Sequence, residues 1–173
     1  MYDLTKKETI LLVSFNMYKG GSLTIYNKIK QLIYKHNNLI NITFGEKFKV
    51  FQDKEIKLIY PLKYLNFFYR FFIEQILVLI IAFIKKPKKL IMLGNFPCIL
   101  FGGPQKIFFH NLLYLSALEF PLKYGLKLTL ESLLWKFSIK LVNPQICVQT
   151  DYVKKSLEDY FKTNLTIETI GCP

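Results

Sequence analysis

The chain has 173 residues, of which 51% are hydrophobic and 16% aromatic. This length and apolar content exclude a disordered chain and predict a single folded domain over residues 1–173. Lys and Arg number 24 against 12 Asp and Glu, so the formal net charge is +12. Such an excess favours an anionic partner. Because no nucleic-acid-binding motif is present, we rank a membrane surface or a phosphate group above nucleic acid.

The cysteines and histidines do not form a metal-binding pattern. Cys98, Cys147 and Cys172 lack CxxC spacing, and the chain has only two histidines, His36 and His110. Reduced cysteines in a cytoplasmic protein explain this distribution best, and we predict no metal site. The polar start of the chain does not resemble a secretory signal peptide.

The N-terminal region predicts a strand, a glycine turn and a helix. The strand is Ile10–Phe15, the turn contains Gly20 and Gly21, and apolar residues at helical spacing then continue to Asn37-Asn38. This order is typical of a nucleotide-binding βαβ unit, in which the glycine backbone approaches a phosphate or a sugar. The pair is not a GxGxxG motif, and the alternative is a tight turn that binds nothing.

The most apolar part of the chain is Leu65–Ile84. Its length is close to the roughly 20 residues that cross a bilayer, but Arg70 and Glu74 oppose a membrane span. We therefore favour a buried or interfacial helix over a span. The lysines of segment 85–89 either contact anionic headgroups or form a solvated helix end. Short strands are predicted before this helix, at Asn41–Phe44, Lys49–Phe51 and Ile56–Tyr60.

A short apolar run, Lys106–Phe109, ends abruptly in His110 and Asn111. Such a run between turn signals predicts a buried strand of a parallel sheet. In an open α/β sheet, ligands bind beyond the carboxyl ends of the strands. His110 and Asn111 are therefore candidate site residues. The alternative is a loop histidine that caps a turn and binds nothing.

The remaining segments continue the alternation of strands and helices. Tyr114–Tyr124 has no clean periodicity and predicts a loop plus a short helix, whereas Thr150 or Asp151 is expected to cap a later helix. The alternation predicts a Rossmann-like α/β domain with three layers and a parallel sheet. The other expected elements are a strand at Leu90–Leu93, a helix with Leu130, Leu133, Leu134, Phe137 and Leu141 on one face and Trp135 beside it, ended by Asn143-Pro144, and strands at Ile146–Gln149 and Leu165–Ile170.

Four landmarks in this order resemble the N-terminal domain of retaining GT-B glycosyltransferases of the family-4 or group-1 type. They span almost the whole chain. They are the Gly20-Gly21 turn, His110-Asn111 at the end of IFFHN, ICVQTDYVKKSLEDYF at Ile146–Phe161, and LTIETIGCP at Leu165–Pro173.

The resemblance implies a division of labour between two domains. In that family two Rossmann-like domains face each other across a cleft, and the C-terminal one holds the nucleotide-sugar. The N-terminal domain supplies acceptor contacts, a glycine loop near the donor phosphates and a histidine near the transferred sugar. Carried over, Gly20 and Gly21 would be the loop, His110 the catalytic histidine, and Asn111 and Thr150 substrate-binding residues. No metal or further cofactor is implied.

The sequence ends where the second domain of this family would begin, so we expect the acceptor-side part of a truncated or split enzyme that is inactive alone. Its partners would be a glycan or lipid-linked acceptor, a nucleotide-sugar held by the other domain, and an anionic membrane surface. Its expected location is the cytoplasm, including the inner face of the cell membrane. A non-catalytic basic binding module and a small membrane protein anchored by Leu65–Ile84 remain as alternatives.

Overall fold

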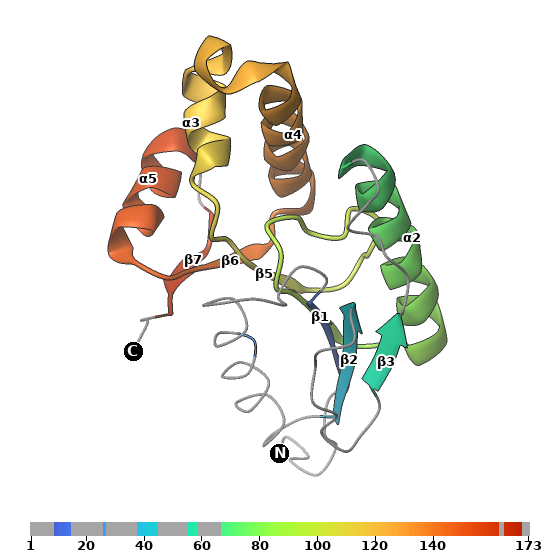
Figure 1. Cartoon of the computed structure of the whole chain (residues 1–173). Coiled ribbons are helices and arrows are strands. Elements are labelled where there is room, and N and C mark those ends of the chain that lie inside the picture. Colours follow the sequence, from blue (N-terminus) through green and yellow to red (C-terminus); the bar gives the residue numbers. More distant parts are fainter. Residues whose placement is uncertain are drawn as a thin grey trace.

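The computed structural model describes residues 9–14, 26, 38–44, 55–58, 67–162 and 165–170. The strands in these ranges form one seven-stranded sheet in the order β3-β2-β1-β4-β5-β6-β7, and every neighbouring pair is parallel (Figure 1). This confirms the expected α/β fold with a parallel sheet. The strands are β1 (Thr9–Ser14), β2 (Asn38–Phe44), β3 (Glu55–Leu58), β4 (Lys89–Met92), β5 (Gln105–Phe108), β6 (Gln145–Val148) and β7 (Ile167–Thr169).

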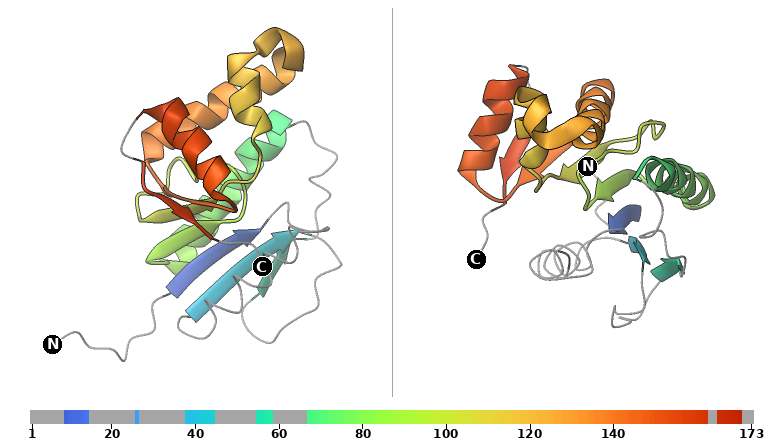
Figure 2. Two further views of the ribbon diagram at one scale, coloured as in Figure 1. Left: turned by 90° about the vertical axis from the view of Figure 1, so that its left-hand side faces the viewer. Right: turned by 45° about the horizontal axis from the view of Figure 1, so that its top comes forward.

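The described helices α2 to α5 lie on one face of this sheet (Figure 2). Alternate residues of β1 separate the two faces, because successive strand side chains point to opposite sides. Leu11 and Val13 join the core beneath the helices, whereas Ile10 and Leu12 pack with the helical residue Tyr26 on the other face. The fold therefore has three layers. The helices are α2 (Phe67–Lys85), α3 (Leu113–Glu119), α4 (Pro121–Val142) and α5 (Asp151–Phe161).

Most predicted elements inside the described ranges agree with the structure to within a few residues. The IFFHN strand is β5, the apolar segment at 65–84 is α2, and α4 ends at Asn143, which adopts the left-handed conformation expected of a helix-ending residue. The Gly20-Gly21 turn and the strand expected at Lys49–Phe51 lie outside the described residues.

One prediction needs correction. Residues 114–124 were expected as a loop with a short helix, but they form most of α3 and the first turn of α4, separated only at Phe120. Helix α3 spans only seven residues, of which Tyr114, Leu115 and Ala117 are buried, so it is too short to show a clear helical period. Gly125, at φ 76° and ψ 160°, then breaks α4 near its start.

The connection between β4 and β5, residues 93–104, contains no helix. Two buried glutamines hold it in place. The Gln75 side chain accepts a hydrogen bond from the Ile99 N–H at 2.8 Å and donates one to the Pro97 carbonyl at 3.1 Å. The Gln105 side chain accepts from the Cys98 N–H and donates to the carbonyls of Cys98 and Phe101, at 2.7–3.0 Å. These bonds replace the backbone pairing that a crossover helix would provide.

The core beneath the helices is centred on Trp135 of α4, which is fully buried. Its ring stacks on Phe109, with centroids 4.9 Å apart, and contacts the rings of Tyr114 and Phe161 at 5.9 and 5.5 Å. A single side chain thus joins the end of β5 to α3, α4 and α5. Trp135 is therefore a packing residue of the core.

Candidate functional site

A pocket of about 80 Å³ lies at the carboxyl edge of the sheet. Strand order reverses between β1 and β4, because β2 and β3 extend one way from β1 and β4 to β7 the other. In open α/β sheets, ligands bind outside the carboxyl ends of strands at such a reversal. The pocket occupies this position, since Val13 and Met92 of these two strands contribute to its wall. The other lining residues are Phe67, Arg70, Phe71, Glu74 and Gln75 of α2, Gly94, Asn95 and Phe96 after β4, His110 after β5, and Tyr114 of α3.

His110, which follows β5, lines this pocket. Its backbone N–H donates a hydrogen bond to Asn95 Oδ1 at 3.1 Å, which ties the end of β5 to the loop after β4. Its ring stacks on Phe108 with centroids 6.4 Å apart and is exposed on its other side. Partial burial lowers the pKa of His110 below 6.5, against the opposing effect of a hydrogen bond to the Phe108 backbone. The imidazole is therefore neutral at pH 7 and can both donate and accept a hydrogen bond.

An Arg–Glu pair on α2 forms the second polar part of the pocket. Arg70 Nε and Glu74 Oε1 are 3.3 Å apart, but the two groups are not oriented for a hydrogen bond. Neither atom has a hydrogen-bond partner among the described residues, although both are buried. Buried polar atoms are normally hydrogen-bonded, so these two atoms are exceptions within the part of the chain that the structure describes.

The ionisation of Glu74 is shifted into the physiological range. Burial raises the pKa of Glu74 from 4.5 to about 7, and the neighbouring Arg70 guanidinium lowers it only in part. Near pH 7 this carboxyl can therefore both donate and accept a proton. In the sequence, Arg70 and Glu74 were noted only as charges that oppose a membrane span. Their spacing of four residues in an otherwise apolar helix was the signal that the two side chains pair.

Asn111 and Thr150 lie at the same carboxyl edge, but neither lines the pocket. Asn111 Oδ1 accepts a hydrogen bond from the Leu113 N–H at 3.2 Å, in the turn that leads into α3. Thr150 Oγ1 accepts one from the Val153 N–H at 3.3 Å and caps α5, as the sequence predicted for Thr150 or Asp151. Gly20 and Gly21, the expected phosphate-side loop, lie outside the described residues.

The geometry brings together a neutral histidine, a carboxyl that titrates near pH 7 and a guanidinium, around a pocket walled by Phe67, Phe71 and Phe96. Such a set can hydrogen-bond hydroxyl groups while an aromatic wall covers an apolar ring face. The sequence matches no protein-family model and no curated protein. Any functional assignment therefore depends on the site itself and on the resemblance described above.

Proposed function

We propose that this chain is the acceptor-side domain of a retaining GT-B glycosyltransferase. It would act with a nucleotide-sugar held by a second domain and transfer the sugar to a glycan or lipid-linked acceptor. The observation that carries this proposal is the position of His110 in a pocket at the strand-order reversal, facing the same space as Arg70 and Glu74. The position of His110 after the IFFHN strand is also where the resemblance places a sugar-facing histidine.

The chemistry of these side chains supports a carbohydrate ligand. A neutral imidazole can hydrogen-bond a sugar hydroxyl and stabilise developing positive charge on the sugar ring. Glu74 Oε1 and Arg70 Nε are an acceptor and a donor on one helix, and neither makes a hydrogen bond among the described residues. Sugar hydroxyls combine donor and acceptor in one group, so they can satisfy both members of this pair.

The size of the pocket limits what it can enclose. A volume of about 80 Å³ is well below the roughly 300–1,000 Å³ of pockets that enclose drug-sized ligands. It can accommodate one hydroxyl-bearing edge of a sugar, whereas the nucleotide and its phosphates must lie outside it. This supports a site whose other wall belongs to a second domain.

Sugar binding can be tested first, and sugar transfer second. Saturation-transfer NMR with the purified chain and a panel of glucose, galactose, mannose and N-acetylglucosamine should show contact for at least one sugar. Both His110→Ala and Glu74→Gln should weaken this contact, whereas the exposed control Glu158→Gln on α5 should not. The chain fused to a GT-B donor-binding domain should transfer sugar, and His110→Ala should lower that rate. Unchanged sugar contact in both site variants would refute the assignment.

A non-catalytic binding module is the second candidate. It is favoured by extensive exposed apolar surface on α2 and α4, beside exposed lysines. It differs from the first proposal in requiring neither His110 nor Glu74. Membrane or partner binding that survives His110→Ala, together with no sugar contact in the wild type, would favour it.

A further inference from the structure

Helix α4 carries an apolar stripe on its exposed side, opposite the side that packs in the core. Six large apolar side chains on α4 are exposed, at spacings of three and four residues, and the five that follow the break at Gly125 lie along one helix face. The opposite face buries Ser132 and Ser138 with Trp135 and Ile139. Helices of globular domains normally turn such a stripe toward the core. The stripe consists of Leu122, Leu126, Leu130, Leu133, Phe137 and Leu141.

Helix α2 repeats this arrangement. Its buried residues Phe71, Val78 and Ala82 face the sheet, and an apolar stripe on the other side is exposed, with Phe83 at 82%. This stripe consists of Tyr69, Phe72, Ile76, Ile80 and Phe83. It extends about 20 Å at 1.5 Å per residue. Among the described helices, only α2 is long and apolar enough to cross a bilayer, but its packing on the sheet favours a position along a membrane surface.

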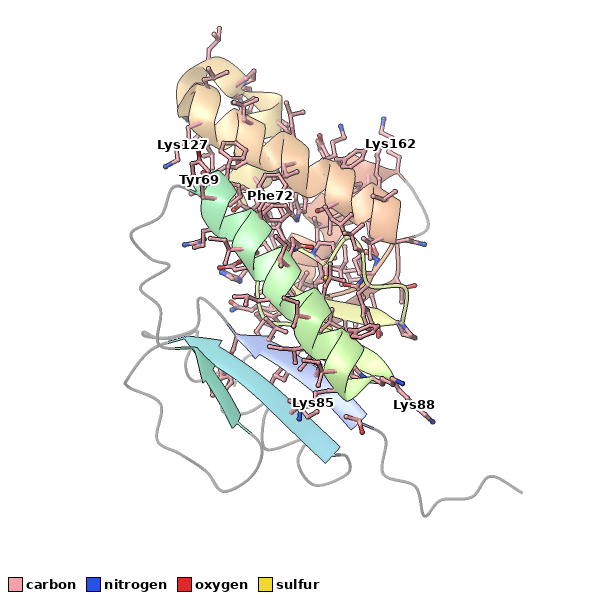
Figure 3. The ribbon with its side chains drawn as sticks, turned by 90° about the vertical axis from the view of Figure 1, so that its right-hand side faces the viewer. Tyr69, Phe72, Lys85, Lys88, Lys127 and Lys162 are labelled. Carbon is pink, nitrogen blue, oxygen red and sulfur yellow. The ribbon has the colours of Figure 1, made fainter. Side chains whose placement is uncertain are left out.

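The two stripes lie on the same side of the molecule. Both helices cover the same face of the sheet (Figures 1 and 2), and the exposed stripe of each lies opposite the residues that the helix buries toward the sheet. Figure 3 views this side, with α4 alongside α2, Tyr69 and Phe72 at one end of α2, and Lys85 and Lys88 at the other. We call the eleven residues of the two stripes the outer apolar face.

We propose that the outer apolar face docks this protein onto a membrane that contains anionic lipids. The inference is independent of sugar transfer and goes beyond it. The eleven side chains offer a single hydrogen-bonding group, the Tyr69 hydroxyl, although protein interfaces average about one hydrogen bond per 100–200 Å². Acyl chains at the headgroup boundary need no such bonds. Tyr69 also suits that boundary, because its ring is apolar and its hydroxyl is polar.

Charge complementarity selects anionic lipid over a second copy of the chain. Lys85, Lys86 and Lys88 are exposed at the C-terminal end of α2, and Lys123, Lys127 and Lys140 are exposed on α4. A symmetric dimer through this face would bring these lysines against their equivalents, because a two-fold interface pairs the same patch on both subunits. Near an anionic membrane each lysine instead strengthens binding, roughly fivefold.

Vesicle flotation of the full chain tests the proposal. The protein should float with vesicles of equal parts phosphatidylcholine and phosphatidylglycerol and bind at least tenfold more weakly to pure phosphatidylcholine. Phe83→Ser combined with Phe137→Ser should weaken binding at least tenfold, because both rings are exposed and belong to different stripes. Tyr152→Ser, an equally exposed aromatic on α5, is the matched control and should bind like the wild type.

The lysines are tested separately with the triple variant Lys85→Gln, Lys86→Gln and Lys88→Gln, which should lose most of the preference for phosphatidylglycerol. Lys155→Gln on α5 is its control. His110→Ala should bind vesicles like the wild type, so failure of the site proposal is distinguishable from failure of this one. Undiminished binding in the Phe83/Phe137 variant, with circular dichroism confirming its fold, would overturn the proposal. The proposal would also be overturned if the wild type formed a dimer and bound no vesicles, while the Phe83/Phe137 variant was a monomer.

Discussion

At the scale of single residues, the candidate site depends on two groups that differ in how they are held. His110 stands at the end of a strand with one side exposed, so its side chain contributes little to packing beyond its contact with Phe108. Glu74 is half-buried in the wall of the pocket next to Arg70, and its ionisation is linked to folding. We therefore expect substitutions of these two residues to affect the free energy of unfolding differently.

We predict that His110→Ala leaves the fold intact while it removes sugar contact. Its free energy of unfolding should fall by less than about 1 kcal/mol, because surface side chains outside special packing arrangements contribute about that much or less. Urea unfolding of the variant and the wild type, paired with the NMR sugar titration, measures both effects. A large loss of stability with unchanged sugar contact would assign His110 a structural role.

Because the pKa of Glu74 is raised, we predict that the free energy of unfolding falls as pH rises from about 4.5 to 7. The folded-state pKa of about 7 lies above the ordinary value of 4.5, so the folded protein binds more protons than the unfolded chain in this window. The free energy of unfolding then decreases with pH, by up to about 3 kcal/mol in total for this group. Glu74→Gln should remove this decrease.

Urea unfolding at several pH values, with Glu158→Gln as the control, measures the slope. Glu158 is the matched control because it also faces a cation four residues away on a helix, Lys154 at 3.9 Å, but is exposed. An identical slope in the Glu74→Gln variant and the wild type would contradict the assignment.

At the scale of elements, the β4–β5 connection shows how side chains substitute for a missing crossover helix. Gln105 alone makes three hydrogen bonds to the backbone of this connection and is buried. The connection carries Asn95, which bonds the His110 backbone, so its conformation helps to shape the pocket.

We predict that Gln105→Leu destabilises the protein by about 2–3 kcal/mol, because it leaves buried backbone groups of Cys98 and Phe101 without their side-chain partner. Gln145→Leu is the matched control. Gln145 donates a hydrogen bond to the exposed carboxylate of Glu168 at 3.0 Å, so its loss should cost less than about 1 kcal/mol. Chemical denaturation compares the two, and equal costs would show that the Gln105 bonds do not stabilise the connection.

At the scale of the whole molecule, the core beneath the helices is joined through the rings around Trp135. Because Trp135 contacts residues from β5, α3 and α5, its packing couples the C-terminal half of the sheet to its helices. The outer apolar face lies on the other side of the same helix α4. One side of this helix thus stabilises the fold, and the other exposes an apolar stripe.

We predict that Trp135→Ala costs about 3–5 kcal/mol, as large-to-small substitutions of buried aromatic residues do. Phe137→Ala, two residues later and exposed, should cost less than about 1 kcal/mol. Thermal and urea unfolding of both variants measure the difference. Similar costs for the two would place Phe137 in the core and remove it from the outer apolar face.

The sequence by itself determined the local features of this protein. Apolar runs between turn residues located β1, β4, β5 and β6, and Asn143 and Thr150 marked a helix end and a helix start, because these signals act over a few residues. The same reasoning placed His110 at the carboxyl edge of the sheet, because ligands bind beyond the C-terminal ends of parallel strands.

Only the tertiary structure decided which of these parts meet. Arg70 and His110 are far apart in the sequence, and they line one pocket because α2 packs over β1 and β4 beside β5. Periodicity identified an apolar stripe on α4, but the stripe is exposed because the α4 side that carries Trp135 packs on the sheet instead. Hydrophobic spacing specifies that a helix has an apolar side, whereas long-range packing determines what, if anything, covers it.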